Sequence, residues 1–249
     1  LMAEEAGSPP DPSAPSILVM IPTYNDFELL GDIVKSIRAE LPNSTVLVIN
    51  DGSDEPIFRN DIGDECLLVG LKMNMGLGLC MHVAFDHFLR YDYDVLARVD
   101  SDGQHPVGSL TKLVQPILQG KASYVVGCRS NRNESRSMRA YLARFVRGYM
   151  AFIVSTVTRG WSPEDITSGF IAADRKTVQH LNRQYLERYP EPQMSLAVGR
   201  QKLPVESIEI EQLDRAHGVS TITVGQALRF LYRFNINVLA VLMQKGTTR

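Results

Sequence analysis

The sequence has few cysteines and little net charge, and both shortages exclude classes of protein. Its 249 residues include three cysteines, Cys66, Cys80 and Cys128, which are odd in number, far apart and outside any Cys-x-x-Cys pair. This pattern argues against a disulfide scaffold or a zinc site and favours a reducing compartment. The formal net charge of -2 lacks the strong basic bias of a nucleic-acid-binding protein.

Long apolar runs and a secretion signal are also lacking. No stretch reaches the roughly 18 unbroken apolar residues of a membrane-spanning helix. Residues 1–15 are acidic and proline-rich and lack the apolar core of a signal peptide. We therefore interpret them as a disordered leader and expect a cytoplasmic protein. The hydrophobic content of 44% suits one large domain, with or without an appendage.

Two kinds of apolar segment alternate along residues 16–128. Short runs rich in β-branched residues predict buried strands, and apolar residues at helical spacing predict helices. The expected strands are 16–21, 45–50, 66–71, 95–100 and 122–128, and the expected helices are 26–41, 77–91 and a segment after Pro106. Continuous apolar strands alternating with helices indicate an α/β fold whose mostly parallel sheet is flanked by helices.

Turn formers and polar side chains follow four consecutive expected strands. The four segments are PTYND (22–26), NDGSD (50–54), KMNMGLG (72–78) and DSDGQHP (100–106). Ligands of such sheets bind outside the carboxyl ends of the strands. The four segments should therefore converge on one cleft.

Each segment alone also has an ordinary structural interpretation. Asp26 is a favoured residue for starting a helix, and Asp-Gly-Ser is a common turn. The glycines at 76 and 78 do not complete a dinucleotide fingerprint, because Met81 occupies the third glycine position. His105 has no second histidine at metal-ligand spacing. Simple turns explain each segment by itself, but their coincidence at four strand ends favours a binding site.

Asp100 and Asp102 stand one residue apart at the end of an expected strand. Two carboxylates held this close raise each other's pKa unless a cation lies between them. Mg²⁺ and Mn²⁺ are commonly held by one or two carboxylates together with substrate phosphates. Such an ion neutralises charge on a departing phosphate. The pair therefore predicts a Mg²⁺ or Mn²⁺ site that serves a diphosphate leaving group.

In this order and at these spacings, PTYND, NDGSD, NMGLG and DSDGQHP resemble the inverting family 2 glycosyltransferases. DSDGQHP and the later DITSGFIAADR (165–175) are most similar to the dolichyl- or polyprenyl-phosphate mannose synthase branch. The resemblance covers residues 16–222. It implies a GT-A-type fold over these residues, a nucleotide-sugar donor and a divalent metal. Residues 223–249 lie beyond it, and we interpret them from their composition as a C-terminal helical appendage.

The resemblance also implies site residues by position. Asp100 and Asp102 would bind the metal, with Gln104 beside them. The family often has two acids before Gly-Ser, whereas this chain has Asn50 before Asp51, which leaves recognition of the donor's base open. The implied donor-binding residues are Pro22, Thr23, Tyr24, Asp26, Asp51, Asn74, Gly78, Asp100, Gln104, Arg129 and Ser220.

The second half of the chain carries further candidates for binding phosphate. Residues 127–139 contain four arginines, which form either a solvated basic loop or a phosphate site; Arg129 matches the family's Gly-x-Arg. RAHGVSTIT (215–223) resembles the family's late Arg-x-x-Gly-x-Ser signature, so Arg215 and Ser220 would close over the diphosphate.

Asp165 and Glu191 are the acids that remain for a general base. A hydroxyl acceptor needs such a base, whereas a phosphate acceptor is already anionic and does not. Asp165 matches the family motif and ranks first; either acid could instead stand at the start of a helix.

The segment VGQALRFLYRFNINVLAVLM (224–243) is apolar nearly all round, interrupted by Arg229 and Arg233. This composition fits an interfacial helix on the cytoplasmic face of a membrane, or a homodimer interface, better than a spanning helix. Both of the first two interpretations stay open.

The sequence therefore favours a metal-dependent inverting glycosyltransferase. It would move a sugar from a nucleoside-diphosphate sugar to a polyprenyl-phosphate or lipid-linked glycan acceptor in cell-surface polysaccharide biosynthesis. Two alternatives are a glycosyltransferase with a soluble saccharide acceptor and a non-catalytic nucleotide-sugar-binding protein of the same fold. The intact DSD argues against the second of these.

Overall fold

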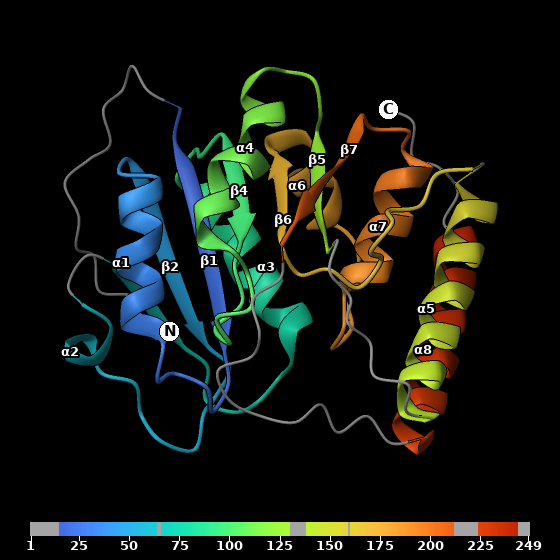
Figure 1. Ribbon diagram of the computed structural model, residues 1–249, viewed down its shortest axis with the longest axis horizontal. Helices are drawn as coiled ribbons and strands as arrows, with labels where there is room; N and C mark the ends of the chain where they lie inside the picture. The colour runs from blue at the N-terminus through green and yellow to red at the C-terminus, as the bar shows by residue number, and fades with distance from the viewer. Residues whose placement is uncertain (1–14, 64–65, 130–137, 159, 212–223, 244–249) are drawn as a thin grey trace.

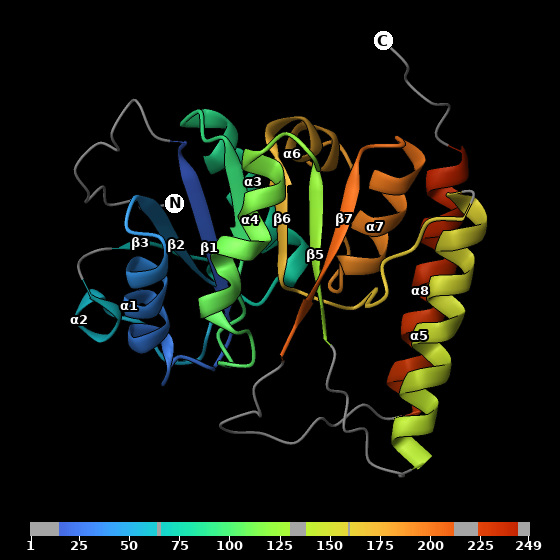
Figure 2. The same cartoon turned by 45° about the horizontal axis from the view of Figure 1, so that its top comes forward.

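A seven-stranded sheet between two helical layers forms the body of the molecule (Figure 1, Figure 2). The computed structural model describes residues 15–63, 66–129, 138–158, 160–211 and 224–243. The strands are β1 (Ile17–Thr23), β2 (Ser44–Asn50), β3 (Cys66–Gly70), β4 (Val95–Arg98), β5 (Tyr124–Arg129), β6 (Ile171–Asp174) and β7 (Val205–Ile210). The helices are α1 (Leu30–Glu40), α2 (Arg59–Ile62), α3 (Leu77–Arg90), α4 (Leu110–Leu118), α5 (Met138–Val157), α6 (Arg175–Leu181), α7 (Glu191–Arg200) and α8 (Val224–Met243), with a short 3₁₀ turn at Val107–Ser109.

The sheet is mostly parallel, as the sequence predicts. Its strand order is β3-β2-β1-β4-β6-β5-β7. Only β6 runs against its neighbours: it pairs antiparallel with both β4 and β5, while the other described pairs are parallel. The carboxyl ends of β1, β2, β3 and β4 therefore lie along one edge of the sheet.

Both faces of the sheet are buried, which explains why the strands are continuous apolar runs. In β1, Val19 and Ile21 pack in a cluster with α1 and α4. The alternate residues Leu18 and Met20 pack on the opposite face with α3, α6 and α7. Side chains alternate along a strand, so each strand supplies both cores.

Helix α1 begins later than the sequence predicts. The expected helix started at Asp26, but the structure starts α1 at Leu30, with Leu29 at the N-cap position and no side-chain cap. Residues before it form a turn in which Thr23 Oγ1 donates to the Asp26 carbonyl oxygen at 2.6 Å. Asp26 is therefore left at the strand end instead of capping the helix.

Helices α5 and α8 lie side by side at one end of the molecule, beyond α7 (Figure 1, Figure 2). Phe234 and Val238 of α8 pack with Met150 of α5 in a third apolar core. Between them, Tyr149 Oη donates to Asn235 Oδ1 at 2.7 Å. The inner face of α8 is therefore part of the folded body. Within the described ranges, none of the helices has the length and apolar character needed to cross a bilayer.

Candidate functional site

A cleft of about 270 Å³ opens where β1, β2 and β4 end, and we call it the strand-end cleft. All four polar segments that follow the strands contribute to its wall, so they converge as expected. The predicted site residues that line it are Pro22, Thr23, Tyr24, Asp26, Asp51, Asn74, Asp100 and Asp102.

Hydrogen bonds join the first two of these segments. Asn25, with φ at 52°, donates through Nδ2 to Asp54 Oδ2 at 2.7 Å and accepts from the Asp54 amide at 2.9 Å. Asn50 Oδ1 accepts from the Ser53 amide at 2.9 Å. Asn50, which stands where the family often has an acid, thus holds the 50–53 turn in shape.

Asp51 joins the second segment to the third. Its Oδ1 accepts from the Met75 amide and its Oδ2 from the Gly76 amide, both at 2.8 Å, and the residue is 5% exposed. Beside it, Gly52 has φ at +70°, and an added Cβ would lie 2.3 Å from the Met73 carbonyl carbon. Asp51 and Gly52 therefore fix the 72–76 loop against the cleft.

Arg98, the last residue of β4, lies under the paired aspartates. It is 3% exposed. Its Nε and Nη2 donate to Asp100 Oδ1 at 2.9 and 2.7 Å, and its Nη1 donates to Glu191 Oε1 at 2.9 Å. The sequence reasoning missed Arg98, although a lone charge inside the apolar run VLARV was a signal, because a buried charge needs a partner.

This arrangement sets the ionisation of the three groups. Burial by itself raises the pKa of Asp100, but the Arg98 charge and His105 outweigh burial and hold that pKa below its usual value. Burial likewise lowers the pKa of Arg98, and its two carboxylate partners more than reverse this. Burial raises the pKa of Glu191 above its usual value, although Arg98 opposes the effect. Asp100 is therefore an anion whose neighbouring cation within the protein is Arg98.

His105 orients the turn that carries the two aspartates. Its Nδ1 accepts from the Asp100 amide at 2.9 Å, and its ring centroid lies 5.2 Å from that of Phe170. Burial lowers the pKa of His105 below its usual value, although the Asp100 carboxylate opposes the effect. A neutral ring with an accepting Nδ1 is the tautomer that this hydrogen bond requires.

The donor set at Asp100 and Asp102 fits Mg²⁺ or Mn²⁺ by its chemistry. Both carboxylates line the strand-end cleft, and oxygen is the donor these ions prefer. Gln104 does not line the cleft. Its backbone N–H donates to Asp102 Oδ1 at 3.1 Å. Over the ranges that the structure describes, no three His, Cys, Asp or Glu side chains group as a metal site. Two carboxylates suit an ion that takes its other ligands from substrate phosphate and water.

Arg129 and Asp165, predicted for different roles, form an ion pair with each other. Arg129 Nε donates to Asp165 Oδ2, and its Nη2 donates to Thr167 Oγ1 at 3.1 Å. Burial lowers the pKa of Arg129, but the bond to Asp165 raises it above its usual value. Neither residue lines the strand-end cleft.

The remaining predicted residues lie elsewhere. Gly78 does not line the cleft; an added Cβ would lie 2.3 Å from the carbonyl oxygens of Leu186 and Glu187, so it allows α3 to approach that loop. Glu191 does not line the cleft and contacts the site through Arg98. Arg215 and Ser220 lie outside the described residues, as do Arg132 and Arg136 of the basic segment.

The structure adds wall residues that the sequence reasoning missed. Arg188 and Tyr189 line the cleft from the loop before α7, and Arg188 Nη2 donates to Asn74 Oδ1 at 2.5 Å. Cys80 also lines it, but burial raises the pKa of its thiol to about 12, so it carries no thiolate at pH 7. No strand-end pattern marked Arg188 and Tyr189, because they come from a loop far along the chain.

Comparison with known proteins gives a family and several relatives. The family described as "Glycosyl transferase family 2" matches residues 18–181. Polyprenol monophosphomannose synthase of Mycolicibacterium smegmatis is 30% identical over 178 residues, covering 66% of this chain and 64% of that protein. Undecaprenyl-phosphate mannosyltransferase of Micrococcus luteus is 24% identical over 233 residues, covering 88% and 94%. The match to the mycobacterial protein thus spans less than two thirds of its length.

Solved structures share the fold. Glucosyl-3-phosphoglycerate synthase from Mycobacterium tuberculosis, in complex with UDP, superposes with a TM-score of 0.67 at 16% identity, over 94% of this chain and 83% of that chain. Its complex with Mn²⁺ and UDP-glucose gives a TM-score of 0.66. At this identity the likeness concerns the fold alone, and the fold is the GT-A-type arrangement that the sequence predicts.

Proposed function

This chain belongs to glycosyl transferase family 2, and on that premise we propose that it moves a sugar from a nucleoside-diphosphate sugar to a polyprenyl phosphate, in a step of cell-surface polysaccharide assembly. The observation that carries the proposal is the convergence of four strand-end segments on one cleft that holds Asp100 and Asp102. The names of the two bacterial relatives, a polyprenol monophosphomannose synthase and an undecaprenyl-phosphate mannosyltransferase, support the acceptor class.

In the proposed complex, the nucleoside lies against the 22–26 and 50–54 segments and the diphosphate faces the aspartates. A Mg²⁺ or Mn²⁺ ion held by Asp102 and Asp100 would neutralise charge on the departing diphosphate. Arg98 keeps Asp100 ionised and fixed in direction. Arg129, Arg215 and Ser220 stay candidates for contacts to the diphosphate.

The reaction we propose is a single displacement with inversion. An acceptor oxygen attacks the anomeric carbon from the face opposite the diphosphate, and the bond to the diphosphate breaks with its electron pair leaving on the nucleoside diphosphate. Such a step needs no covalent enzyme nucleophile. It needs a base only if the acceptor oxygen carries a proton.

The pairing of both candidate bases favours a phosphate acceptor. Asp165 accepts from Arg129 and also from the Thr167 amide and hydroxyl at 3.2 and 3.0 Å. Glu191 accepts from Arg98. Both carboxylates are thus already engaged by an arginine, and neither lines the strand-end cleft, so neither is placed to take a proton from an acceptor there. An anionic phosphate oxygen removes the need for either acid.

The test is transfer by the purified protein with Mn²⁺. GDP-mannose, UDP-glucose and UDP-N-acetylglucosamine serve as donors, and undecaprenyl phosphate, a lipid-linked glycan and a soluble oligosaccharide serve as acceptors. We expect a polyprenyl-phosphate sugar as product. Asp165→Asn and Glu191→Gln should each lower turnover by less than the roughly 10²- to 10⁴-fold that a general base contributes. Transfer to glycan alone, abolished by either change, would contradict the phosphate acceptor.

We also propose that the outward faces of α5 and α8 contact an anionic membrane surface. Phe152 of α5 is 67% exposed and Leu239 of α8 is 60% exposed. Neither helix sequence contains an aspartate or glutamate, and both contain arginines. Basic helices with exposed aromatic and aliphatic side chains favour anionic lipid surfaces. A homodimer through these faces is the alternative.

A further inference from the structure

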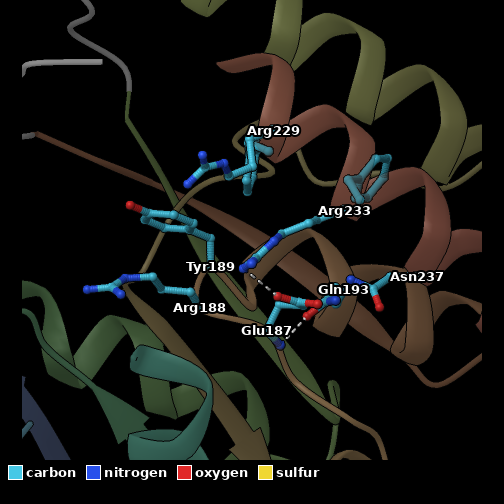
Figure 3. A pocket seen from close by; sticks show the side chains of 9 residues that line it. Glu187, Arg188, Tyr189, Gln193, Arg229, Arg233 and Asn237 are labelled. Carbon is cyan, nitrogen blue, oxygen red and sulfur yellow. Dashed lines mark hydrogen bonds and ion pairs between the residues drawn. The ribbon is translucent and has the colours of Figure 1, made fainter. Parts of the chain in front are cut away.

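Figure 3 shows the residues that line a second cleft, of about 370 Å³. It lies between the loop at Glu187–Tyr189 and the middle of α8, from Arg229 to Asn237, and we call it the α8 cleft. Arg188 and Tyr189 line both clefts, so the two share a wall. A group bound in the α8 cleft would therefore lie beside whatever occupies the strand-end cleft.

Most of the charged side chains that line the α8 cleft are basic. The charged residues are the three arginines Arg188, Arg229 and Arg233 and a single carboxylate, Glu187. Arg233 Nη1 contacts Glu187 Oε2 at 3.3 Å, which holds this guanidinium at the cleft. In Figure 3 the guanidinium groups of Arg188 and Arg229 point in the same direction on either side of the Tyr189 ring. Three guanidinium groups against one carboxylate favour an anionic ligand, and arginine binds phosphate through paired N–H groups.

Aromatic side chains line the same cleft. The rings of Tyr189 and Phe230 meet edge to face with centroids 5.4 Å apart, and the buried Phe234 also lines the cleft. Inorganic phosphate has no apolar group that could pack against these rings. Arginines beside aromatic rings suit a phosphate group attached to an apolar chain.

We propose that the α8 cleft is the acceptor subsite, which binds the acceptor's phosphate through Arg229 and Arg233 and its adjoining chain against Tyr189 and Phe230. The proposal rests on the proposed function and specifies where the acceptor lies. Across the shared wall, a phosphate oxygen would approach the anomeric carbon of a sugar held in the strand-end cleft. The oxygen–carbon bond forms as the nucleoside diphosphate leaves, and no proton is transferred.

The test measures direct binding of farnesyl phosphate, farnesol and inorganic phosphate to the full chain by isothermal titration calorimetry. The double variant Arg229→Gln/Arg233→Gln removes the proposed phosphate contacts, and Arg90→Gln, an exposed arginine at the far end of α3, is the matched control. Loss of two charge-assisted contacts should weaken farnesyl phosphate binding by roughly tenfold or more. The control should bind like the unmodified chain, and farnesol and inorganic phosphate should each bind more weakly.

Three outcomes would overturn the proposal: no farnesyl phosphate binding by the unmodified chain, equal binding by the double variant, or equal affinity for inorganic phosphate. Nucleoside diphosphate binding with Mn²⁺ should be unchanged in the double variant, which separates this cleft from the strand-end cleft. If no acceptor supports transfer but the double variant loses farnesyl phosphate binding, the proposed function fails and the α8 cleft remains a lipid-phosphate binding site without an acceptor role. If transfer to undecaprenyl phosphate occurs with the same KM in the double variant, the subsite fails alone.

Discussion

Arg98 is a guanidinium buried at the end of a strand, with one carboxylate on each side. Removing water from a charge costs several kcal/mol, and only good partners offset that cost. Asp100 lies two residues away, whereas Glu191 comes from the start of α7. The triad fixes the base of the DSD turn, so changing Arg98 should affect both stability and the cleft above it.

Arg98→Met should destabilise the protein by about 3–5 kcal/mol at pH 8, because two carboxylates lose their buried cation. Asp100 has a depressed pKa in the folded protein, so its stabilising contribution exists above the unfolded pKa and disappears as the pH falls. Glu191 has a raised pKa, so its ionisation opposes folding as the pH rises. Without Arg98 the pKa values of Asp100 and Glu191 both rise. Protonation of the two carboxylates at low pH then reduces the stability that the variant has lost.

Urea unfolding at pH 8 and pH 5 measures this effect. The deficit of Arg98→Met relative to the unmodified chain should be smaller at pH 5. Lys35→Met is the control, because its contact with Asp32 is exposed on both sides, and it should change little at either pH. Equal deficits at the two pH values would show that the loss comes from packing instead of charge.

Asp102→Asn should remove most of the Mn²⁺-dependent affinity for a nucleoside diphosphate and leave the fold intact. An amide keeps the shape of the side chain but lacks the charge that a divalent ion needs. The measurement is the melting temperature with GDP or UDP, with and without Mn²⁺; each tenfold loss of affinity lowers the ligand's stabilisation by about 1.4 kcal/mol at saturation. Asp32→Asn, exposed on α1, is the control. An unchanged response to Mn²⁺ would contradict the role of Asp102.

The loops at the strand ends form one connected unit. Asn25 forms a hydrogen bond with the 50–54 turn, and Asp51 forms one with the 72–76 loop. Arg188, in the loop before α7, forms one with Asn74. Each contact joins segments that are well separated along the chain. The shape of the strand-end cleft therefore depends on loop-to-loop hydrogen bonds as well as on the sheet beneath them.

Gly52→Ala tests this connection, with Gly120→Ala as its matched control. Both glycines have positive φ, at +70° and +68°, but an added Cβ at Gly120 meets nothing within 4 Å, whereas at Gly52 it meets the Met73 backbone. Gly120→Ala should cost about 1–2 kcal/mol of stability, the usual cost of that conformation. Gly52→Ala should cost more and also weaken nucleoside diphosphate binding. If the two changes affected nucleoside diphosphate binding equally, the position of the 72–76 loop would not determine donor binding.

The molecule combines a three-layer α/β/α body, in which one sheet lies between two layers of helices, with a helix pair at one end. The α/β/α body contains the strand-end cleft, and α8 contributes Arg229 and Arg233 to the α8 cleft. The outward side chains of α5 and α8 belong to the same end of the molecule as this second cleft. If the helix pair contacts a membrane as proposed, a lipid acceptor would reach the α8 cleft from that surface.

Phe152→Ser/Leu239→Ser should reduce binding to vesicles that contain anionic lipid, by roughly tenfold or more given the apolar area removed. Leu118→Ser, an exposed change on α4, is the control. Vesicle flotation at low and high salt measures the effect, and binding of the unmodified chain should fall with salt. The homodimer would be favoured instead if the unmodified chain did not bind vesicles but formed a dimer, and if the double change dissociated that dimer.

Local patterns in the sequence determined the α/β architecture of residues 16–128 and the location of the strand-end cleft. Periodicity within each segment predicted the α/β alternation, because burial on both faces of the sheet demands continuous apolar strands. Parallel strands place their carboxyl ends on one edge, so the positions of PTYND, NDGSD, KMNMGLG and DSDGQHP along the chain were enough to assign them to one cleft. The apolar segment 224–243 likewise predicted the full extent of α8.

Only the tertiary structure decided which distant residues meet. The antiparallel insertion of β6, the contact of Arg98 with Glu191, the pairing of Arg129 with Asp165 and the packing of α8 on α5 join segments far apart in the chain. Periodicity reports the environment of a side chain but does not name its partner, because many partners satisfy the same burial. The path of the chain settles that choice, and with it the α8 cleft, whose wall joins the loop before α7 to residues some 40 positions later.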